Sequence, residues 1–233
     1  MIADIKQFLG HGLYTVAEAA LYARINKSTL ARWIFGDARS RSVITPEIDA
    51  GEKLVSFLDF VQALAVRNIR VQKNVPLQKI REAMRFAEKT WGMKYPFAMR
   101  HTTYLWGDNI VISPPNARDD AIRQYVEASG AHKGSVLLTP IVELYLEDLD
   151  FADSKKGVAV GCNIFRWSNT VIKMNPHQRF GEPLLPSGYS VRAIWDAVEV
   201  EGGVTEAAQA YDIPREEVQV ALRFLDHLSG NAA

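Results

Sequence analysis

Small polar and basic side chains gather between positions 27 and 41, in a pattern that can read DNA. Arg32 carries a planar guanidinium that can donate two hydrogen bonds to a guanine in the major groove. Ser28 and Thr29 can bind phosphate oxygens together with the N-terminus of a helix. Two further arginines follow in a loop that can lie as a wing against the DNA backbone. The candidate DNA-binding residues are Lys27, Ser28, Thr29, Arg32, Arg39 and Arg41.

Two short helical patterns must position these side chains. Thr15 followed by Glu18 is the spacing of a capping box, which predicts a helix starting near residue 16. A turn at residues 24–26 follows, with Ile25 directed inward, and Ser28 is predicted to cap a second helix. The residues predicted to face the core are Val16, Ala19, Ala20, Ala23, Leu30, Trp33 and Ile34. Such a pair is typical of a helix-turn-helix, although an ordinary helical hairpin with a solvated polar face gives the same pattern.

The charge of the chain is unevenly distributed. The 233 residues carry no net charge, and 48% hydrophobic with 23% charged residues is ordinary for a soluble globular protein. Residues 1–94 hold 15 Lys and Arg against 9 Asp and Glu, a balance of +6, so residues 95–233 have −6. This asymmetry favours a polyanionic partner for the first part, but attraction between the two parts explains it equally.

The short apolar runs and the single cysteine of the chain indicate a cytoplasmic protein. The longest apolar runs are too short to cross a bilayer, and the first ten residues lack the apolar core of a signal peptide. Cys162 is the only cysteine, which excludes an internal disulfide and a cysteine-based zinc cage.

The rest of the chain predicts mixed structure. Residues 52–66 show a helical apolar stripe that is either a dimer element or intramolecular core, and a second amphipathic helix ends near Gly92. A hairpin is expected around residues 107–109 and a strand at 157–167. Residues 117–128 and 139–151 are predicted as helices, and helices return after 171.

Residues 205–224 form a second pattern resembling a helix-turn-helix. Its expected outer face carries Glu206, Glu216 and Glu217 against Arg215. Because phosphates repel such a face, it favours binding of a protein, or dimerisation, over DNA.

No pattern in the chain predicts catalysis. The five histidines have no ligand spacing, and no base is evident for a Cys162 nucleophile. The acids of 143–153 form a solvated face on this interpretation. We therefore expect no enzyme activity, no cofactor and no metal.

Two segments resemble known families. "YTVAEAALYARINKSTLARWIFG" resembles the start of MerR-like winged helix-turn-helix domains. Residues 171–224 are similar to a small helical family found in antitoxins, through Asn175-Pro176, Phe180-Gly181-Glu182-Pro183, Gly188, a helix pair from Gly203 to Tyr211, and Val218 to Leu222. The chain departs from that family at Glu182, where Arg or Lys is common, and at Tyr189, where a small residue is usual. The combination, which leaves out roughly 100–165, resembles long VapB-type antitoxins.

The resemblance implies an architecture and a role. The expected fold is mainly α (α+β), with a MerR-like DNA-binding domain and connecting helices at 1–94, a mixed α/β region at 95–170 and a helical antitoxin-associated domain at 171–233. The implied protein is a homodimer that represses its own promoter and neutralises a PIN-like ribonuclease toxin. The candidate toxin-binding residues are Glu147, Asp148, Asp150, Phe180 and Glu182. The alternative is a MerR-like regulator that senses a small-molecule effector through residues 95–170.

Overall fold

The computed structural model describes residues 13–48, 53–72, 74–99, 103–107, 109–113, 125–137, 148–152 and 157–230. Within these ranges the fold is mixed, with seven α-helices and small sheets. Two compact units divide the chain, one of Tyr14–Ala159 and one of Val160–Ala233 together with Met1–Leu13. The predicted three-part domain organisation stays a prediction.

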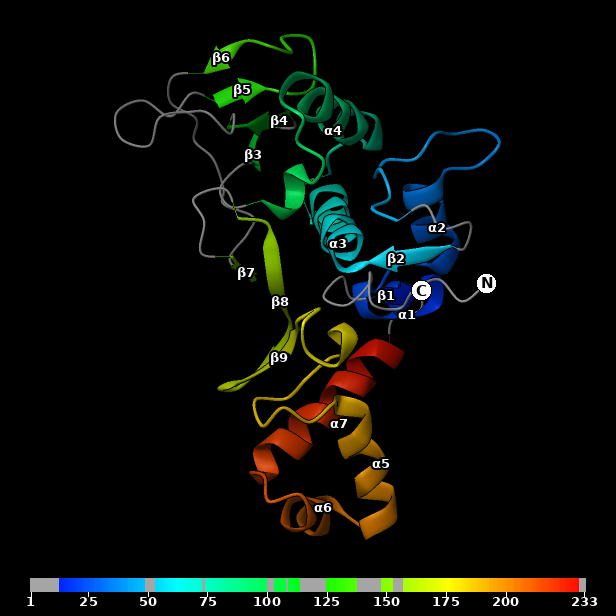
Figure 1. Ribbon diagram of the computed structural model, residues 1–233, viewed down its shortest axis with the longest axis vertical. Coiled ribbons are helices and arrows are strands. Elements are labelled where there is room, and N and C mark those ends of the chain that lie inside the picture. The colour runs from blue at the N-terminus through cyan, green and yellow to red at the C-terminus, as the bar shows by residue number, and fades with distance from the viewer. Residues whose placement is uncertain are drawn as a thin grey trace. The chain divides into compact units, whose positions relative to one another are not determined.

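The first unit is built around a long buried helix. Its elements are β1 (Leu13–Thr15), α1 (Val16–Ala23), α2 (Lys27–Phe35), β2 (Leu54–Ser56), α3 (Phe57–Gln72), α4 (Leu77–Trp91), the 3-10 turn η2 (Pro96–Ala98), β3 (Thr103–Trp106), β4 (Asn109–Ile112), β5 (Tyr125–Glu127), β6 (Val136–Leu137) and β7 (Leu149–Phe151). Strands β1 and β2 pair with each other, and α3 packs against α1, α2 and η2 (Figure 1).

The apolar stripe predicted over residues 52–66 belongs to the core of this unit. Phe57, Phe60 and Val61 on α3 are almost completely buried within the chain. Intramolecular core is therefore the interpretation observed for these residues, while Leu54, Leu58 and Leu64 of the stripe are half-buried and a role in dimerisation stays a prediction. Helix α4 ends at Gly92, whose left-handed backbone (φ 66°) closes the last turn, as predicted.

A four-stranded antiparallel sheet follows α4. The sheet order is β3-β4-β5-β6, and α4 packs against β4. The predicted hairpin at residues 107–109 is confirmed, since Trp106 pairs with Asn109. The helices predicted at 117–128 and 139–151 are wrong where they can be compared, because β5 and β7 are strands; residues 117–124 and 139–147 lie outside the described residues. Pairing of β5 with β4 is non-local and overrides the local helical spacing.

The second unit combines a hairpin with three helices. Its elements are β8 (Ala159–Trp167), which confirms the predicted strand, β9 (Thr170–Met174), the 3-10 turn η3 (Arg179–Gly181), α5 (Val191–Glu201), α6 (Val204–Ala210) and α7 (Arg215–Ser229). Helix α7 packs against α5, α6 and β9, and Phe165 of β8 lies 5.5 Å from the ring of Phe224.

Glu217 corrects the predicted acidic face of this unit. Its side chain is buried, and Oε2 accepts a hydrogen bond from the Ser187 backbone N–H at 3.1 Å. One of the three carboxylates expected on the surface thus fixes the loop before α5.

Among the described helices, none is both long and apolar enough for a bilayer crossing.

A buried carboxylate joins the loop after α2 to the start of α3. Both oxygens of Asp59 accept hydrogen bonds from the Glu47 N–H, at 3.2 and 3.1 Å, and Ser56 exchanges hydrogen bonds with Asp59 across the first turn. Burial outweighs these hydrogen bonds and raises the pKa of Asp59 to about 6.

This raised pKa predicts a pH-dependent stability. Because the folded state holds the Asp59 proton more tightly than the unfolded state, the stabilisation is complete below about pH 4 and is lost as the pH rises through 6. Relative to Asp59→Asn, the free energy of unfolding of the wild type should increase by about 1 kcal/mol from pH 7.5 to pH 5. Urea unfolding at both pH values measures this, and a difference between the two proteins that does not change with pH contradicts it.

Candidate functional site

The first helix of the pair begins at the predicted capping box. Glu18 donates its backbone N–H to Thr15 Oγ1 at 3.2 Å, while Glu18 Oε2 accepts the N–H of Thr15 at 2.8 Å. The small apolar face of α1 is buried as expected. Its alanines allow α2 to approach closely, which is the packing that a helix-turn-helix requires.

The turn between the helices differs from the prediction in one respect. Arg24 adopts a left-handed conformation (φ 52°) that ends α1. The N-cap of α2 is Asn26, whose Oδ1 accepts the Ser28 backbone N–H at 2.9 Å and the Ser28 hydroxyl at 2.7 Å. The predicted Ser28 cap is therefore wrong, because the turn closes two residues earlier. Ile25 is half-buried.

Helix α2 separates a buried face from an exposed one. Leu30, Trp33 and Ile34 are buried, as predicted. Lys27, Ser28 and Arg32 are exposed, and Thr29 is half-buried. The first turn of α2 therefore presents short polar side chains and a cation, with a guanidinium one turn further along, which is the chemistry that reaches base edges and phosphates.

The loop after α2 is a tight turn closed by Asp37. Oδ1 of Asp37 accepts the backbone N–H groups of Arg39 at 2.8 Å and Ser40 at 2.6 Å. These hydrogen bonds hold the pKa of Asp37 below its usual value. Arg39 and Arg41 are exposed on this turn. Residues 36–48 contain bends and neither helix nor strand, so the expected wing is a loop here.

The position of this loop is fixed at the C-terminal end of α2. The carbonyl oxygen of Trp33 accepts two backbone hydrogen bonds, from Val43 at 2.7 Å and Ile44 at 2.9 Å. Both side chains are buried, so the chain returns to the core directly after the exposed turn. All six candidate DNA-binding residues thus lie on α2 or on the loop anchored to it, and their contact with DNA stays a prediction.

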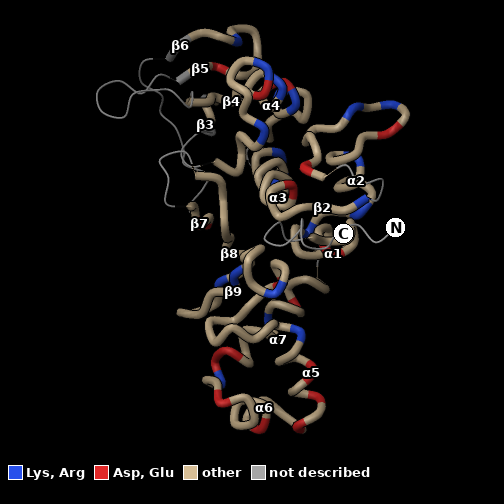
Figure 2. Tube along the Cα trace, in the orientation of Figure 1, with Lys and Arg blue, Asp and Glu red and all other residues tan. Residues whose placement is uncertain are grey.

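Helix α4 carries two arginines beside the loop after α2 that are not among the predicted DNA-binding residues. Arg81 Nε donates to the Ser42 carbonyl oxygen at 3.4 Å, and Arg85 lines a cavity facing the loop. Figure 2 shows basic positions both on the loop after α2 and on α4. Arg81 and Arg85 are four residues apart, opposite the buried side of α4, and this spacing is visible in the sequence. Which loop they face depends on long-range packing that the spacing does not reveal.

The candidate toxin-binding residues belong to both units. Glu147 lies outside the described residues, whereas Asp148 and Asp150 are exposed near the end of the first unit. Phe180 and Glu182 are exposed in the second unit. Their contact with a toxin stays a prediction.

Phe180 occupies an unfavourable backbone conformation. Arg179 (φ 42°), Phe180 (φ 56°) and Gly181 (φ 88°) are three consecutive residues with positive φ. Bulky side chains rarely adopt this region, and strain of this kind is concentrated at functional sites. The Phe180 side chain is 61% exposed, so the hydrophobic core does not explain the strain.

Among the described residues, no cluster of His, Cys, Asp and Glu is placed to ligate a metal.

The fold occurs in a solved structure. No protein-family model matches the chain. The crystal structure of Rv2018 from Mycobacterium tuberculosis has a TM-score of 0.61 over 91% of this chain and 97% of that one, at 21% identity. This similarity establishes the fold alone.

In sequence, the chain is similar to a protein of Mycobacterium tuberculosis (strain ATCC 25618 / H37Rv) described as "Putative antitoxin VapB45". The two are 23% identical over 228 residues, which cover 90% of this chain and 92% of the relative.

The observed cap of α2 predicts unequal effects of two neighbouring substitutions. Asn26→Ala removes the acceptor for the Ser28 N–H, and it should lower the free energy of unfolding by about 1 kcal/mol. Ser28→Ala keeps that acceptor and should cost less than half as much. Chemical denaturation of both variants measures this, and a larger loss for Ser28→Ala contradicts the assignment of the cap.

Proposed function

We propose that this protein is a non-enzymatic antitoxin that binds and neutralises a PIN-like ribonuclease toxin and represses its own operon. The observation that carries the antitoxin role is the similarity to VapB45 over nine-tenths of both chains. A match of this extent includes both compact units, so it is not confined to a common DNA-binding module.

DNA binding is assigned to α2 and the loop after it. Lys27, Ser28 and Arg32 are exposed while the opposite side of α2 is anchored in the core. We infer that the first turn of α2 enters the major groove, with Arg32 on a guanine and the loop arginines on phosphates. A homodimer on a two-fold operator would double this contact.

Toxin binding is assigned to exposed acids and to Phe180. Asp148 and Asp150 can occupy a basic RNA channel of a ribonuclease or disturb its metal site. An exposed aromatic ring held on a strained backbone is pre-organised for a partner's pocket, which is how interface anchors act.

The alternative function is a MerR-like regulator that responds to a small molecule. That function places the effector within residues 95–170, outside the cavity that Arg85 lines, which is formed by residues of 35–45 and 84–94. A neighbouring toxin gene and a tight protein partner favour the antitoxin; an effector that changes DNA affinity favours the regulator.

Loss of Arg32 should abolish specific DNA recognition. Arg32→Ala removes the proposed guanine contact, so affinity for the DNA upstream of the gene should fall at least tenfold at about 0.15 M salt. A gel shift with non-specific competitor measures this. Arg192→Ala, which removes an exposed arginine of α5, should leave binding unchanged.

Equal affinities of the wild type and Arg32→Ala for the upstream DNA would contradict sequence-specific DNA recognition by α2. Absence of DNA binding by the folded wild type, with and without the toxin, would contradict the repressor function.

Removal of the Phe180 ring should weaken toxin binding without unfolding the protein. Phe180→Ala should raise the Kd for the toxin encoded beside the gene at least tenfold, because exposed anchors typically contribute about 2 kcal/mol or more. Isothermal titration calorimetry gives the Kd, and thermal unfolding checks the fold. Val71→Ala, at another highly exposed apolar side chain, is the matched control.

An unchanged Kd of Phe180→Ala for the toxin would mean that other residues bind the toxin. The double substitution Asp148→Asn/Asp150→Asn tests the acidic contribution in the same assay. Full neutralisation by that variant contradicts the charge-based part of the proposal.

A further inference from the structure

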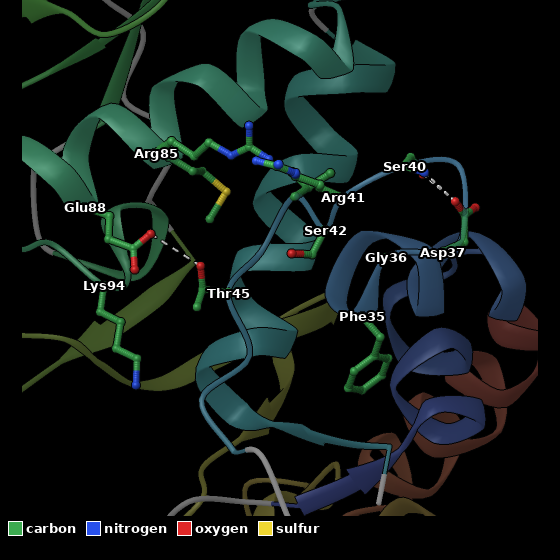
Figure 3. Close-up of a pocket in the computed structure, with 12 residues that line it drawn as sticks. Phe35, Gly36, Asp37, Ser40, Arg41, Ser42, Thr45, Arg85, Glu88 and Lys94 are labelled. Carbon is green, nitrogen blue, oxygen red and sulfur yellow. Dashed lines mark hydrogen bonds between the residues drawn. The ribbon is translucent and has the colours of Figure 1, made fainter. Parts of the chain in front are cut away.

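A cavity of about 320 Å³ separates the loop after α2 from helix α4. Its loop side carries Asp37, Arg41 and Thr45, and its other side carries Arg85, Glu88 and Lys94 (Figure 3). Both sides belong to the first unit. Nothing in the sequence prediction assigned a role to the α4 side.

Two guanidinium groups line this cavity, Arg41 from the loop and Arg85 from α4. Figure 3 shows the Arg41 and Arg85 side chains extending toward one another from the loop and from α4. Arg41 is exposed and Arg85 is half-buried, so a ligand can reach them from solvent. Neither guanidinium has a hydrogen-bond or carboxylate partner within the described part of the chain.

The acids of the cavity form hydrogen bonds with neutral groups of the loop. Asp37 accepts hydrogen bonds from two backbone N–H groups and from the Ser40 hydroxyl. Glu88 Oε2 lies 3.5 Å from Thr45 Oγ1. The cavity wall thus carries three cations, Arg41, Arg85 and Lys94, against the carboxylates of Asp37 and Glu88. An anion bound between the two guanidinium groups would lower their mutual repulsion.

The backbone holds this arrangement in place without a ligand. A Cβ added at Gly36 (φ 72°) would lie 2.9 Å from the Ser40 carbonyl oxygen and 3.0 Å from the Ser42 nitrogen, so only glycine allows the tight return of the loop. The Arg81 hydrogen bond to Ser42 joins the loop to α4. The two guanidinium groups are thus carried by elements fixed to each other.

We propose that Arg41 and Arg85 form a clamp for one phosphate group, supplied by the backbone of the DNA that α2 reads. Each guanidinium has a planar fork that matches two phosphate oxygens, and two forks can share one phosphate. Lys94 adds a further positive charge to the wall of the cavity. The inference rests on the proposed DNA binding and adds α4 to the DNA-binding surface.

A shared phosphate predicts non-additive substitutions. Arg41→Gln and Arg85→Gln should each lower DNA affinity three- to tenfold, equally for operator and unrelated sequences. The double variant should lose little more DNA affinity than the single variant with the larger loss. The slope of its plot of log K against log [salt] should be smaller in magnitude than that of the wild type by about one. Arg192→Gln, with the same change in charge in the second unit, controls for net charge.

Additive losses, with the salt slope falling by about two in the double variant, would overturn the shared clamp. An Arg85→Gln variant that binds DNA as tightly as the wild type would overturn the role of α4 while leaving DNA binding by α2 intact. In that case Arg32→Ala would still lose specific binding, so the two failures are distinguishable.

The source of the phosphate is tested by NMR of the arginine Nε–Hε groups in the full chain. Addition of a short operator duplex should shift the Arg41 and Arg85 signals, and inorganic phosphate at matched ionic strength should shift them only weakly. Saturable shifts with inorganic phosphate but none with DNA would overturn the DNA assignment in favour of a free phosphate ligand. No shift with either would overturn the site.

Discussion

The carbonyl oxygen of Trp33 determines how the rest of the candidate site is arranged. It accepts backbone hydrogen bonds from Val43 and Ile44, so the chain must leave α2, turn and return to the core within ten residues. The short excursion exposes Arg39 and Arg41 beside the helix that carries the other candidate residues. Without this anchor, the loop arginines and the cavity beside α4 would have no fixed relation to α2.

The two units differ in surface chemistry. Basic residues of the first unit lie on α2, its loop and α4 (Figure 2), although Asp148 and Asp150 are exposed in the same unit. The second unit carries exposed acids such as Glu182 and the strained Phe180. The charges of the two units differ in the same sense: Tyr14–Ala159 holds 20 Lys and Arg against 17 Asp and Glu, a balance of +3, and the remainder holds 7 against 10, a balance of −3. A protein that binds DNA with one end and a protein partner with the other needs such a separation, because phosphates and an acidic surface repel each other.

Local signals were readable from the sequence, and long-range ones were not. The capping box at Thr15 and the buried Leu30 follow from spacing within one or two turns, which depends on neighbours only. Asn26 and Ser28 are both good caps, and the left-handed end of α1 decides between them. The buried state of Glu217 depends on a backbone group thirty residues away, and the position of Arg85 depends on how α4 meets the loop. Neither relation leaves a periodic trace in the sequence.

The most direct test of the central claim, that α2 reads the major groove, is a methylation-protection footprint on the DNA upstream of the gene. Dimethyl sulfate modifies guanine N7 in the major groove, the atom that Arg32 would contact. The account predicts protected guanines in two half-sites about one helical turn apart, with protection lost in Arg32→Ala at protein concentrations that restore binding. Binding without guanine N7 protection, or protection that persists in Arg32→Ala, would contradict it.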